Sequence, residues 1–471
     1  MASIRIDHGI VLTMDPQRRI IKDGSVVIEG DRIVAVGKTA DLAGAHPADQ
    51  VLDATDKIVM PGLVDCHVHH CQTLLRGLAN DIDLIAWCYD ITYPYESVLT
   101  DEDTYLSALL ADIEMIRTGT TTVADPGGYR MDHVARALID SGLRGIICWA
   151  AMDQWSVDRP LPDGLPGKTT TDEAISQQER LIKEWHGAAN GRLRASCGLR
   201  VEPNVSDALY RRTQALSEKY GVLVQFHAAV NRDQVEWVRR HTGQTTIEHM
   251  HTLGVLQENW LLTHMAVLTD HEVELLYRQG TRLCHNPGAT LKGAYGAIRH
   301  GKFPEMIEAG LTVGTGCDST AANDSLDMFR TMYLVATAHK EFRLQADLIP
   351  PEKALEMATI TGAKALMWDD QIGSLEPGKK ADVIVVDVRR SNWVPLHDFS
   401  LVPTLVYSGD GADVETSIVD GQIVMRDRRI LTVDVDDVLE RAQHAAKGIV
   451  ARLRAAGVPH MGKLLPRWPV V

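Results

Sequence analysis

The fold is decided by residues 61–70, PGLVDCHVHH, a short apolar run that ends in closely spaced histidines. Side chains at positions i and i+2 of a β-strand point to the same face, so the imidazoles of His67 and His69 should enter one space. A His-x-His pair also arises by chance. Whether this pair is part of a site therefore depends on which other side chains the rest of the chain brings close to it.

Outward from this stretch, short apolar runs alternate with helical stretches, which is typical of βαβ units and a parallel sheet. Eight consecutive units are what a closed (β/α)8 TIM barrel requires, and we predict that fold. An open doubly wound sheet is the alternative, but no GxGxxG follows the first strand and no GxxxxGK[ST] occurs. The expected strands are 61–69, 120–126, 143–152, 193–203, 222–229, 260–268, 281–287 and 311–319.

The two ends of the chain show a different sequence pattern, in which short β-type runs are separated by Gly and Asp. Runs such as GSVVIEG and RIVAVGK near the start match ADVIVVDV and ETSIVDG near the end. We predict that residues 1–59 and 371–435 pair into one small β-sandwich domain. Residues 60–370 then form the barrel, and residues 436–471 form a helical extension.

Composition narrows the class of function. A formal net charge of −15 argues against nucleic acid or an anionic membrane as partner, because neither attracts an acidic protein. The start of the chain lacks a signal peptide, no window is apolar enough for a membrane helix, and the 7 cysteines show no CxxC pair. These features predict a cytoplasmic protein and leave small organic substrates open.

Metal-competent side chains end several of the predicted strands. VLVQFHAA ends near His227, WLLTHMAVL contains His264, TRLCHNP contains His285, and LTVGTGCDST contains Asp318. In a parallel barrel these strand ends lie on one face, where the active site is built. Imidazoles and a carboxylate suit zinc, and iron, cobalt or nickel as well.

Together these features resemble the amidohydrolase superfamily, and most closely its branch of cytosine and guanine deaminases, S-adenosylhomocysteine-type deaminases and triazine hydrolases. The stretches GTTTVADPG, HNPGATLKGAYG, GTGCDSTAANDSLDMF and GSLEPGKKADVIVVD add to the resemblance, which covers nearly the whole chain. It implies one divalent metal ion, with Zn²⁺ first and Fe²⁺, Co²⁺ or Ni²⁺ as alternatives. The implied metal ligands are His67, His69, His227 and Asp318, while His264 would orient water and substrate.

The chain departs from this branch at one important position. The branch usually carries a glutamate three residues after the fifth-strand histidine, where it moves protons to a ring nitrogen and the leaving group. Here the stretch reads His227-Ala228-Ala229-Val230, and valine cannot transfer a proton. The fourth strand offers Arg200 and Glu202 instead of a lysine, which weakens a two-metal interpretation.

These residues predict a metal-dependent hydrolase whose catalytic groups are His264 and Asp318. Metal-activated water, with its pKa lowered to roughly 7, would attack an amide, urea or carbamate-like C–N bond. Within the same family, a deaminase with a displaced shuttle, a hydrolase that displaces chloride or thiolate from a ring, and a dehydrating cyclase remain open. A metal-free scaffold protein is a further alternative, although all four ligand positions are filled.

Aromatic residues gather after the first and third predicted strands, in a chain with only 5% aromatics. They could line an apolar or aromatic substrate pocket or support a subunit contact, and we also expect a homo-oligomer. The predicted substrate-binding residues are Trp87, Tyr89, Tyr93, Trp155, Glu202, His285 and Asn286.

Overall fold

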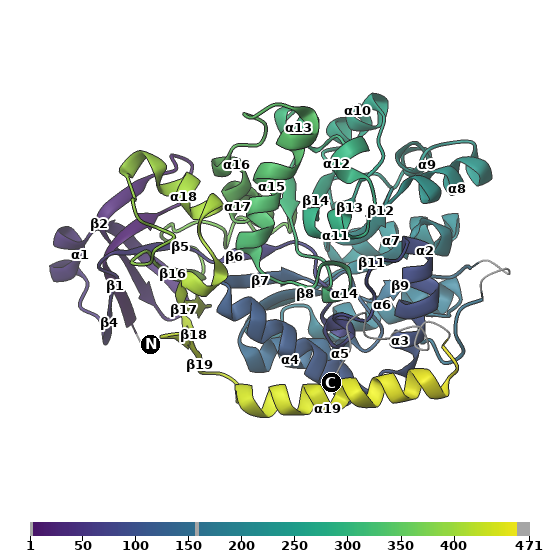
Figure 1. The fold of residues 1–471 in the computed structure, drawn as a ribbon, viewed down its shortest axis with the longest axis horizontal. Coiled ribbons are helices and arrows are strands. Elements are labelled where there is room, and N and C mark those ends of the chain that lie inside the picture. Colours follow the sequence, from purple (N-terminus) through teal and green to yellow (C-terminus); the bar gives the residue numbers. More distant parts are fainter. Residues whose placement is uncertain (1–2, 156–159, 459–471) are drawn as a thin grey trace, which may run out of the picture.

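A computed structural model describes residues 3–155 and 160–458 of the chain. Residues 459–471 of the predicted helical extension lie outside the described residues. A barrel and a smaller β-rich part lie side by side, and helix α19 runs along one edge of the molecule (Figure 1).

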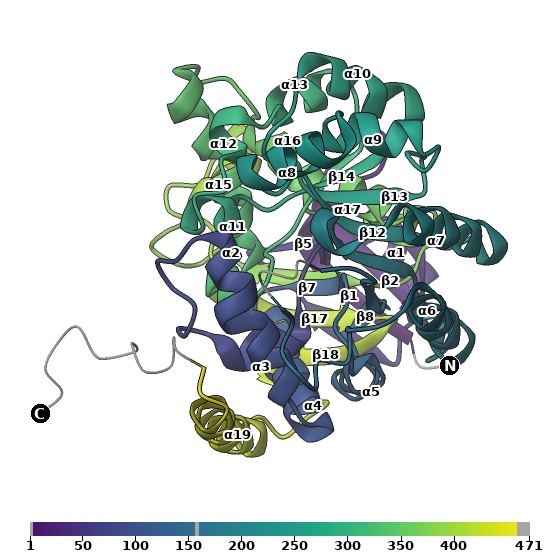
Figure 2. The ribbon, with the colours of Figure 1, turned by 90° about the vertical axis from the view of Figure 1, so that its right-hand side faces the viewer.

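The centre of the chain forms the predicted (β/α)8 barrel from parallel strands (Figure 2). The third and fourth strands are each divided between a four-stranded and a six-stranded sheet, so that these two strands join the sheets. Backbone hydrogen bonds from Cys66 N to Thr315 O (3.0 Å) and from Asp318 N to His67 O (2.8 Å) close the ring. The strands are β6 (Leu63–Asp65), β7 (Thr120–Ala124), β8 (Arg144–Ile147) with β9 (Ala150–Ala151), β10 (Leu193–Ala195) with β11 (Cys197–Val201), β12 (Val224–Ala228), β13 (Trp260–His264), β14 (Arg282–His285) and β15 (Val313–Thr315).

Helices follow the strands and cover the outside of the barrel (Figure 2). Helix α4 begins with a capping box between Thr100 and Asp103, and α6 and α10 begin in the same way. The main helices are α4 (Asp101–Arg117), α5 (Met131–Ser141), α6 (Thr171–Trp185), α7 (Asp207–Tyr220), α8 (Arg232–Thr242), α9 (Thr246–Thr252), α10 (Asp270–Gln279), α13 (Phe303–Glu308), α15 (Met328–Arg343), α16 (Pro351–Met357) and α17 (Ile360–Ala365).

Shorter helical segments extend the loops at the carboxyl ends of the strands. The longest insertion lies between β6 and α4, where the sequence predicted an aromatic loop. The segments are η1 (His70–Leu75), α2 (Leu84–Ala86), η2 (Trp87–Thr92), α3 (Tyr93–Val98), η3 (Glu202–Asn204), α11 (Pro287–Lys292), α12 (Ala297–His300) and α14 (Thr320–Asn323).

The two ends of the chain pair as predicted. One hydrogen-bonded sheet of nine strands contains strands from both ends, and β5 pairs with β16 across its centre. Ile28, Val59, Val383 and Ile418 share one hydrophobic core, so neither end can bury its apolar face alone. The strands are β1 (Ser3–Leu12), β2 (Ile20–Glu29), β3 (Arg32–Lys38), β4 (Gln50–Asp53), β5 (Lys57–Pro61), β16 (Val383–Asp387), β17 (Val414–Val419), β18 (Gln422–Arg426) and β19 (Arg429–Ile430), with α1 (Thr39–Ala45), η4 (Asp398–Ser400), α18 (Leu401–Tyr407) and η5 (Gly411–Asp413) between them.

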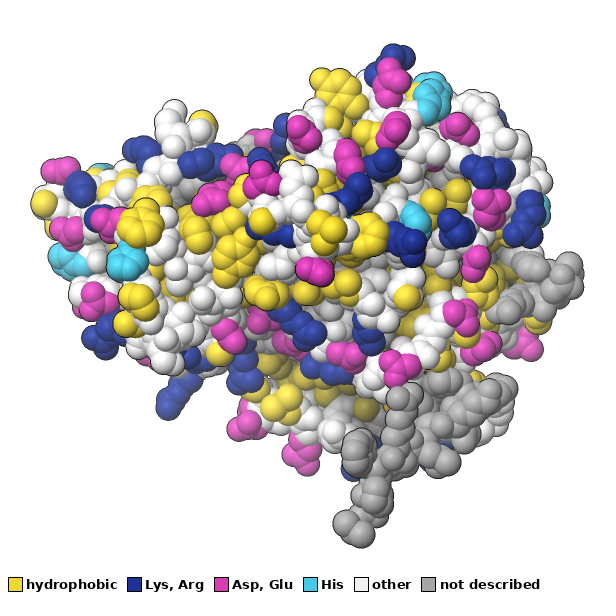
Figure 3. Space-filling view, turned by 45° about the horizontal axis from the view of Figure 1, so that its top comes forward, with side chains coloured by type: hydrophobic (Ala, Val, Ile, Leu, Met, Phe, Trp, Pro, Cys, Tyr) yellow, Lys and Arg dark blue, Asp and Glu magenta, His cyan; other side chains and the backbone are white. Residues whose placement is uncertain are grey.

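Helix α19 (Val435–Ala455) packs through Ala442, Ile449 and Leu453 against the insertion that follows β6. None of the helices within residues 3–155 and 160–458 is both long and apolar enough to cross a membrane. On the face shown in Figure 3, acidic and basic side chains are interspersed over most of the surface.

Candidate active site

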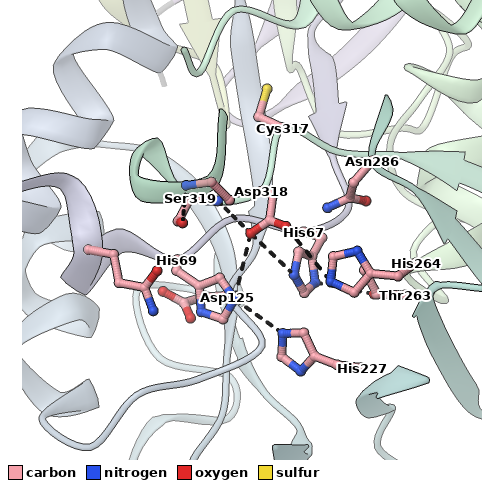
Figure 4. A network of polar contacts seen from close by, with 12 residues as sticks. His67, His69, Asp125, His227, Thr263, His264, Asn286, Cys317, Asp318 and Ser319 are labelled. Atoms are coloured by element: carbon pink, nitrogen blue, oxygen red, sulfur yellow. Dashed lines mark hydrogen bonds and ion pairs between the residues drawn. The ribbon is translucent and has the colours of Figure 1, made fainter. Parts of the chain in front are cut away.

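Five side chains from four places in the sequence meet at the carboxyl ends of the barrel strands (Figure 4). His67 and His69 follow β6, His227 lies on β12, His264 ends β13, and Asp318 follows β15. All five are buried. Four of the five polar strand ends recognised in the sequence therefore converge on one point, and the strand end with His285 does not.

The atoms that face one another are imidazole nitrogens and carboxylate oxygens. His69 Nε2 lies 3.2 Å from His227 Nε2. The Nε2 atoms of His67 and His69 each lie 3.9 Å from Asp318 Oδ1. His264 Nε2 lies 3.8 Å from Asp318 Oδ2.

These side chains fit a divalent cation. The Nδ1 atoms of His67 and His69 face Thr263 Oγ1 (3.2 Å) and the Gly127 carbonyl (3.4 Å), so a proton on the His69 Nδ1 leaves the Nε2 lone pair free. His67 Nε2 has no hydrogen-bond partner among the described residues. Buried lone pairs that face one another require a shared proton or a cation.

The electrostatics favour neutral histidines. Burial and the neighbouring imidazoles hold the pKa of His67 and His69 well below the usual value, and burial with Arg200 lowers the pKa of His227 to about 3. Burial, together with the nearby Asp65 carboxylate, raises the pKa of Asp318 to about 7. Neutral imidazoles are the form that binds metal, and a bound cation would stabilise the Asp318 carboxylate.

The backbone is strained at two of these positions. His264 has φ 79° and Asp318 has φ 65°, in the left-handed region that residues with a Cβ seldom adopt. Such strain persists only where the surrounding structure holds it, and it is concentrated at functional sites. Nothing in the sequence signals it, because neither position carries glycine.

A buried ionic network supports the first histidine pair. His70 lies between Asp112 (Nε2 to Oδ1, 3.2 Å) and Asp125 (Nδ1 to Oδ2, 2.9 Å). Burial opposes charge on His70, but the two carboxylates outweigh it and raise its pKa to about 10. Asp125 also accepts a hydrogen bond from Gly127 N, and Gly127 in turn faces His69. Our sequence reasoning did not identify this network, although Asp125 lies in the stretch GTTTVADPG.

A small pocket of about 50 Å³ is lined by four of the five side chains, His69, His227, His264 and Asp318, and not by His67. Trp87 and Tyr93, both predicted to bind substrate, line it together with Val230. Among the described residues that line the pocket, Asp318 is the only carboxylate. The position where related enzymes carry a proton shuttle is therefore apolar and faces the pocket.

Arg200 and Gln72, which sequence reasoning did not assign to the substrate, also line this pocket. Both donate to Glu96 Oε1, Gln72 Nε2 at 2.9 Å and Arg200 Nη2 at 3.0 Å. The Arg200 guanidinium lies 5.2 Å from the centre of the Tyr93 ring. Long-range pairing of this kind has no local signal in the sequence.

A second cavity, of about 540 Å³, lies beside the first. Tyr89, Trp155 and Glu202 line it, so these three predicted substrate residues are separated from the small pocket. Glu202 Oε1 accepts hydrogen bonds from Ala229 N and from Thr246 Oγ1 (3.1 Å). Burial raises the pKa of Glu202 to about 7.

The two remaining predicted substrate residues are neighbours that face different ways. Asn286 lies beside Asp318 (Figure 4). His285 does not reach the pocket, because its ring stacks on Phe303 with 3.9 Å between the centroids and its Nε2 lies 3.2 Å from His339 Nε2. Alternation at the end of β14 explains the difference.

Comparisons with known proteins identify a family, related sequences and related structures. A sequence profile described as Amidohydrolase family matches residues 58–424. The 5'-deoxyadenosine deaminase of Methanosarcina mazei is 36% identical over 97% of this chain and 100% of its own length. The 5-methylthioadenosine/S-adenosylhomocysteine deaminase of Desulforudis audaxviator is 36% identical over 91% of this chain and 95% of its own length. The crystal structure of an adenosine deaminase from Xanthomonas campestris with bound zinc is 26% identical, with a TM-score of 0.88 over 96% of this chain and 99% of that one.

Proposed function

Because this chain belongs to the amidohydrolase family and is a metal-dependent hydrolase of C–N bonds other than peptide bonds, we propose that it cleaves an amide, urea or carbamate-like bond. The substrate is a small apolar or aromatic molecule. One observation carries the proposal: Val230 faces the pocket, and Asp318 is the only carboxylate among the described residues that line it. Proton transfer therefore depends on Asp318 and His264.

The residues suited to hold one metal ion are His67, His69, His227 and Asp318. Zinc is the proposed ion, supported by the zinc in the adenosine deaminase structure and by a donor set of imidazoles and one carboxylate. A divalent ion held there lowers the pKa of water and polarises a carbonyl group.

Asp318 is placed to handle the proton. Its carboxylate lies between the histidine cluster and His264, and accepts the proton of the attacking water. The same oxygen then returns the proton to the departing nitrogen.

His264 is placed to stabilise the developing oxyanion. Its Nε2 faces Asp318, and its ring meets Tyr295 edge-on at 5.7 Å between centroids.

The choice of bond follows from the absence of a shuttle at Val230. Hydrolysis of an aromatic amine requires a proton on a ring nitrogen before ammonia can leave. Hydrolysis of a carbonyl compound places the developing charge on oxygen, which His264 can stabilise, and requires one proton at the leaving nitrogen. Two proton-handling groups suffice for the second reaction.

Deamination is the second candidate, and two observations favour it. Curated relatives 36% identical over more than nine-tenths of the chain are named as deaminases of adenosine-like nucleosides. The buried carboxyl of Glu202, with a pKa near 7, adjoins Ala229 beside the pocket. A nucleoside substrate would extend from the small pocket into the cavity lined by Tyr89 and Trp155.

A mass-spectrometric panel distinguishes the candidates. Zinc-loaded protein is incubated with amides, ureas, carbamates, 5'-deoxyadenosine and 5-methylthioadenosine. Cleavage with the gain of one water supports the proposal. A gain of one mass unit with release of ammonia supports deamination, and loss of water from an amino amide indicates a cyclase.

Two further proposals concern the cellular location and the assembly of the protein. We propose a cytoplasmic location and a homo-oligomeric assembly, supported by the acidic composition, by the lack of CxxC pairs among the 7 cysteines and by the exposed aromatic residues. Light scattering of purified protein tests the assembly.

A further inference from the structure

A groove outside the catalytic pocket lies between helix α19 and the insertion that follows β6. It has a volume of about 620 Å³, within the range of small-ligand sites, and shares no described lining residue with the catalytic pocket. Helix α19 forms one wall along the edge of the molecule (Figure 1), while Leu74 of η1 and Leu110 of α4 lie on the other. Helix η1 begins directly after His69, so the groove borders the segment that follows the metal-binding histidines.

The floor of the groove is apolar. Leu74 and Ala442 are 6% and 2% exposed and belong to the hydrophobic core that joins α19 to the insertion. Along α19, Leu439, Ala446 and Val450 are separated by seven and four residues, so they lie on one face of the helix, toward the groove. Leu439 is still 44% exposed. An apolar ligand along this face would therefore remove further apolar surface from water.

Two cations without a partner edge this apolar face. Lys447 and Arg454 line the groove seven residues apart, and neither side chain forms an ion pair or a hydrogen bond within the described part of the chain. Arg76, on the opposite wall, is already paired with Glu114. None of the described residues that line the groove is acidic, although the chain carries a formal net charge of −15. The edge of the groove therefore favours an anion.

The groove is long and narrow. From Leu439 to Arg454 it follows α19 for about 22 Å, at a rise of about 1.5 Å per residue. Its volume over that length corresponds to a mean width of about 6 Å, whereas an α-helix with its side chains is about 10–12 Å across. The groove is therefore too narrow to admit a helix. An extended peptide would leave its backbone N–H and C=O groups against apolar side chains without partners.

We propose that this groove binds a free, unbranched fatty acid. The acyl chain lies along Leu439, Ala446 and Val450, and the carboxylate meets Lys447 and Arg454. A hydrocarbon chain needs no hydrogen-bond partner along its length, and only its carboxylate needs a cation. The source is the free acid and not a membrane, because an anionic membrane surface repels an acidic protein. This assignment stands apart from the proposed function.

Direct binding tests the proposal. Zinc-loaded full-length protein is titrated calorimetrically with decanoate, hexanoate, 1-decanol and decyltrimethylammonium, each below the concentration at which it aggregates. A fully buried methylene contributes about fourfold in affinity, so half-burial of four methylenes predicts that decanoate binds at least about tenfold more tightly than hexanoate. The cations should favour decanoate over 1-decanol by about threefold, the scale of an exposed ion pair, and disfavour decyltrimethylammonium.

Variants locate the site. Lys447→Met combined with Arg454→Met keeps the aliphatic stems and should abolish the preference for decanoate over 1-decanol. Val450→Trp fills the groove and should weaken both ligands at least about tenfold. If Val450→Trp does not fold by circular dichroism, Leu439→Asn replaces it, because Leu439 is partly exposed and a polar side chain there can reach water. Arg389→Met is the control, because the side chain of Arg389 is 75% exposed in the β-rich part and does not line the groove.

Undetectable binding of decanoate, equal affinity for hexanoate or decyltrimethylammonium, unchanged binding in Val450→Trp, or an equal loss in Arg389→Met would each overturn the assignment. Co-sedimentation of native protein with phosphatidylglycerol vesicles would also overturn it, in favour of a membrane surface. A change of mass in light scattering caused by Val450→Trp alone would make the groove a contact between copies of this chain instead. Because no turnover is measured, failure of the proposed amide hydrolysis would leave the binding result intact.

Discussion

The carboxylate of Glu202 accepts a hydrogen bond from the backbone N–H of Ala229, one residue before Val230. A carboxyl group therefore adjoins the turn where related enzymes carry their shuttle, but it approaches from β11 and not from β12. Its Oε1 is engaged by Ala229 and Thr246, while Oε2 has no partner among the described residues. Glu202 is thus either a support for this turn or a relocated proton shuttle.

The first prediction separates these roles with Glu202→Gln. Glutamine keeps an oxygen for Ala229 and Thr246 but cannot transfer a proton. We expect C–N hydrolysis of the best amide substrate to change less than about fivefold, against the 10²–10⁴-fold loss of a true general acid–base. Steady-state kinetics on zinc-loaded protein measures this.

Glu202→Ala is the matched control. It leaves the Ala229 N–H without an acceptor, so the free energy of unfolding should fall by about 1–3 kcal/mol in urea titration. A Glu202→Gln variant that folds normally and loses ammonia release from an adenosine-like nucleoside would support deamination instead.

The second prediction concerns metal content. Purified native protein should hold about one divalent ion per chain, because four ligands and no bridging lysine describe a single site. His67→Ala should lose most of that metal and retain its far-ultraviolet circular dichroism, since apolar strand residues build the barrel core. Two tightly held ions per chain, measured by plasma mass spectrometry, would contradict it.

The third prediction assigns His264 to chemistry and not to metal retention. His264→Ala should keep about one ion per chain and lose turnover by roughly 10² or more, as expected for a missing oxyanion group. His264 Nε2 lies as close to the Asp318 carboxylate (3.8 Å) as the Nε2 atoms of His67 and His69 do (3.9 Å), so geometry alone does not separate the two roles. Metal loss in parallel with activity would make His264 a ligand.

Much of the site could be predicted because its signals are local. His67 and His69 share one strand end, and His227, His264 and Asp318 each end another, so strand periodicity and barrel geometry suffice to bring them together. The pairing of the two termini followed equally from matching apolar runs.

Other features depend on contacts between residues far apart in the chain. The Gln72–Glu96–Arg200 cluster joins two loop helices to a strand, and no pattern in the sequence links them. His285 resembled a site residue by position, but its neighbour Asn286 takes the inward direction while His285 packs on Phe303. Which of two adjacent residues turns inward depends on where the strand stops, and the sequence locates that only to within a residue or two.

The fourth prediction concerns pH and the metal-stripped protein. Burial raises the pKa of Asp318 to about 7, whereas the unfolded carboxyl titrates near its usual 3.8. Between these values folding takes up a proton, so Asp318 destabilises the stripped protein progressively from pH 4 to pH 7 and by a constant amount above. Asp318→Asn lacks this cost.

The stripped Asp318→Asn variant should therefore be more stable than stripped native protein at pH 8, by on the order of a few kcal/mol, and the gap should narrow toward pH 4. Urea denaturation of both at pH 5 and pH 8 measures the gap. A gap that is independent of pH would show that Asp318 does not titrate in this range.

The last prediction concerns Val230, which is 3% exposed and lines the pocket with Asp318 and His264. We expect native protein to be a poor deaminase of 5'-deoxyadenosine, because losing a positioned proton shuttle costs about 10²–10⁴ in rate, or ~3–5 kcal/mol. Val230→Glu alone should raise that deamination less than about tenfold. The new carboxyl supplies a proton, but the orientation of the substrate ring must change as well. Val230→Gln is the matched control for size and polarity, and ammonia release from zinc-loaded native, Val230→Glu and Val230→Gln proteins is measured side by side.

Two outcomes would contradict the prediction: rapid deamination by native protein, or a gain of 10² or more in Val230→Glu that Val230→Gln does not share. Either would show that the ring already lies in the orientation for deamination, and the amide-directed function would have to be abandoned.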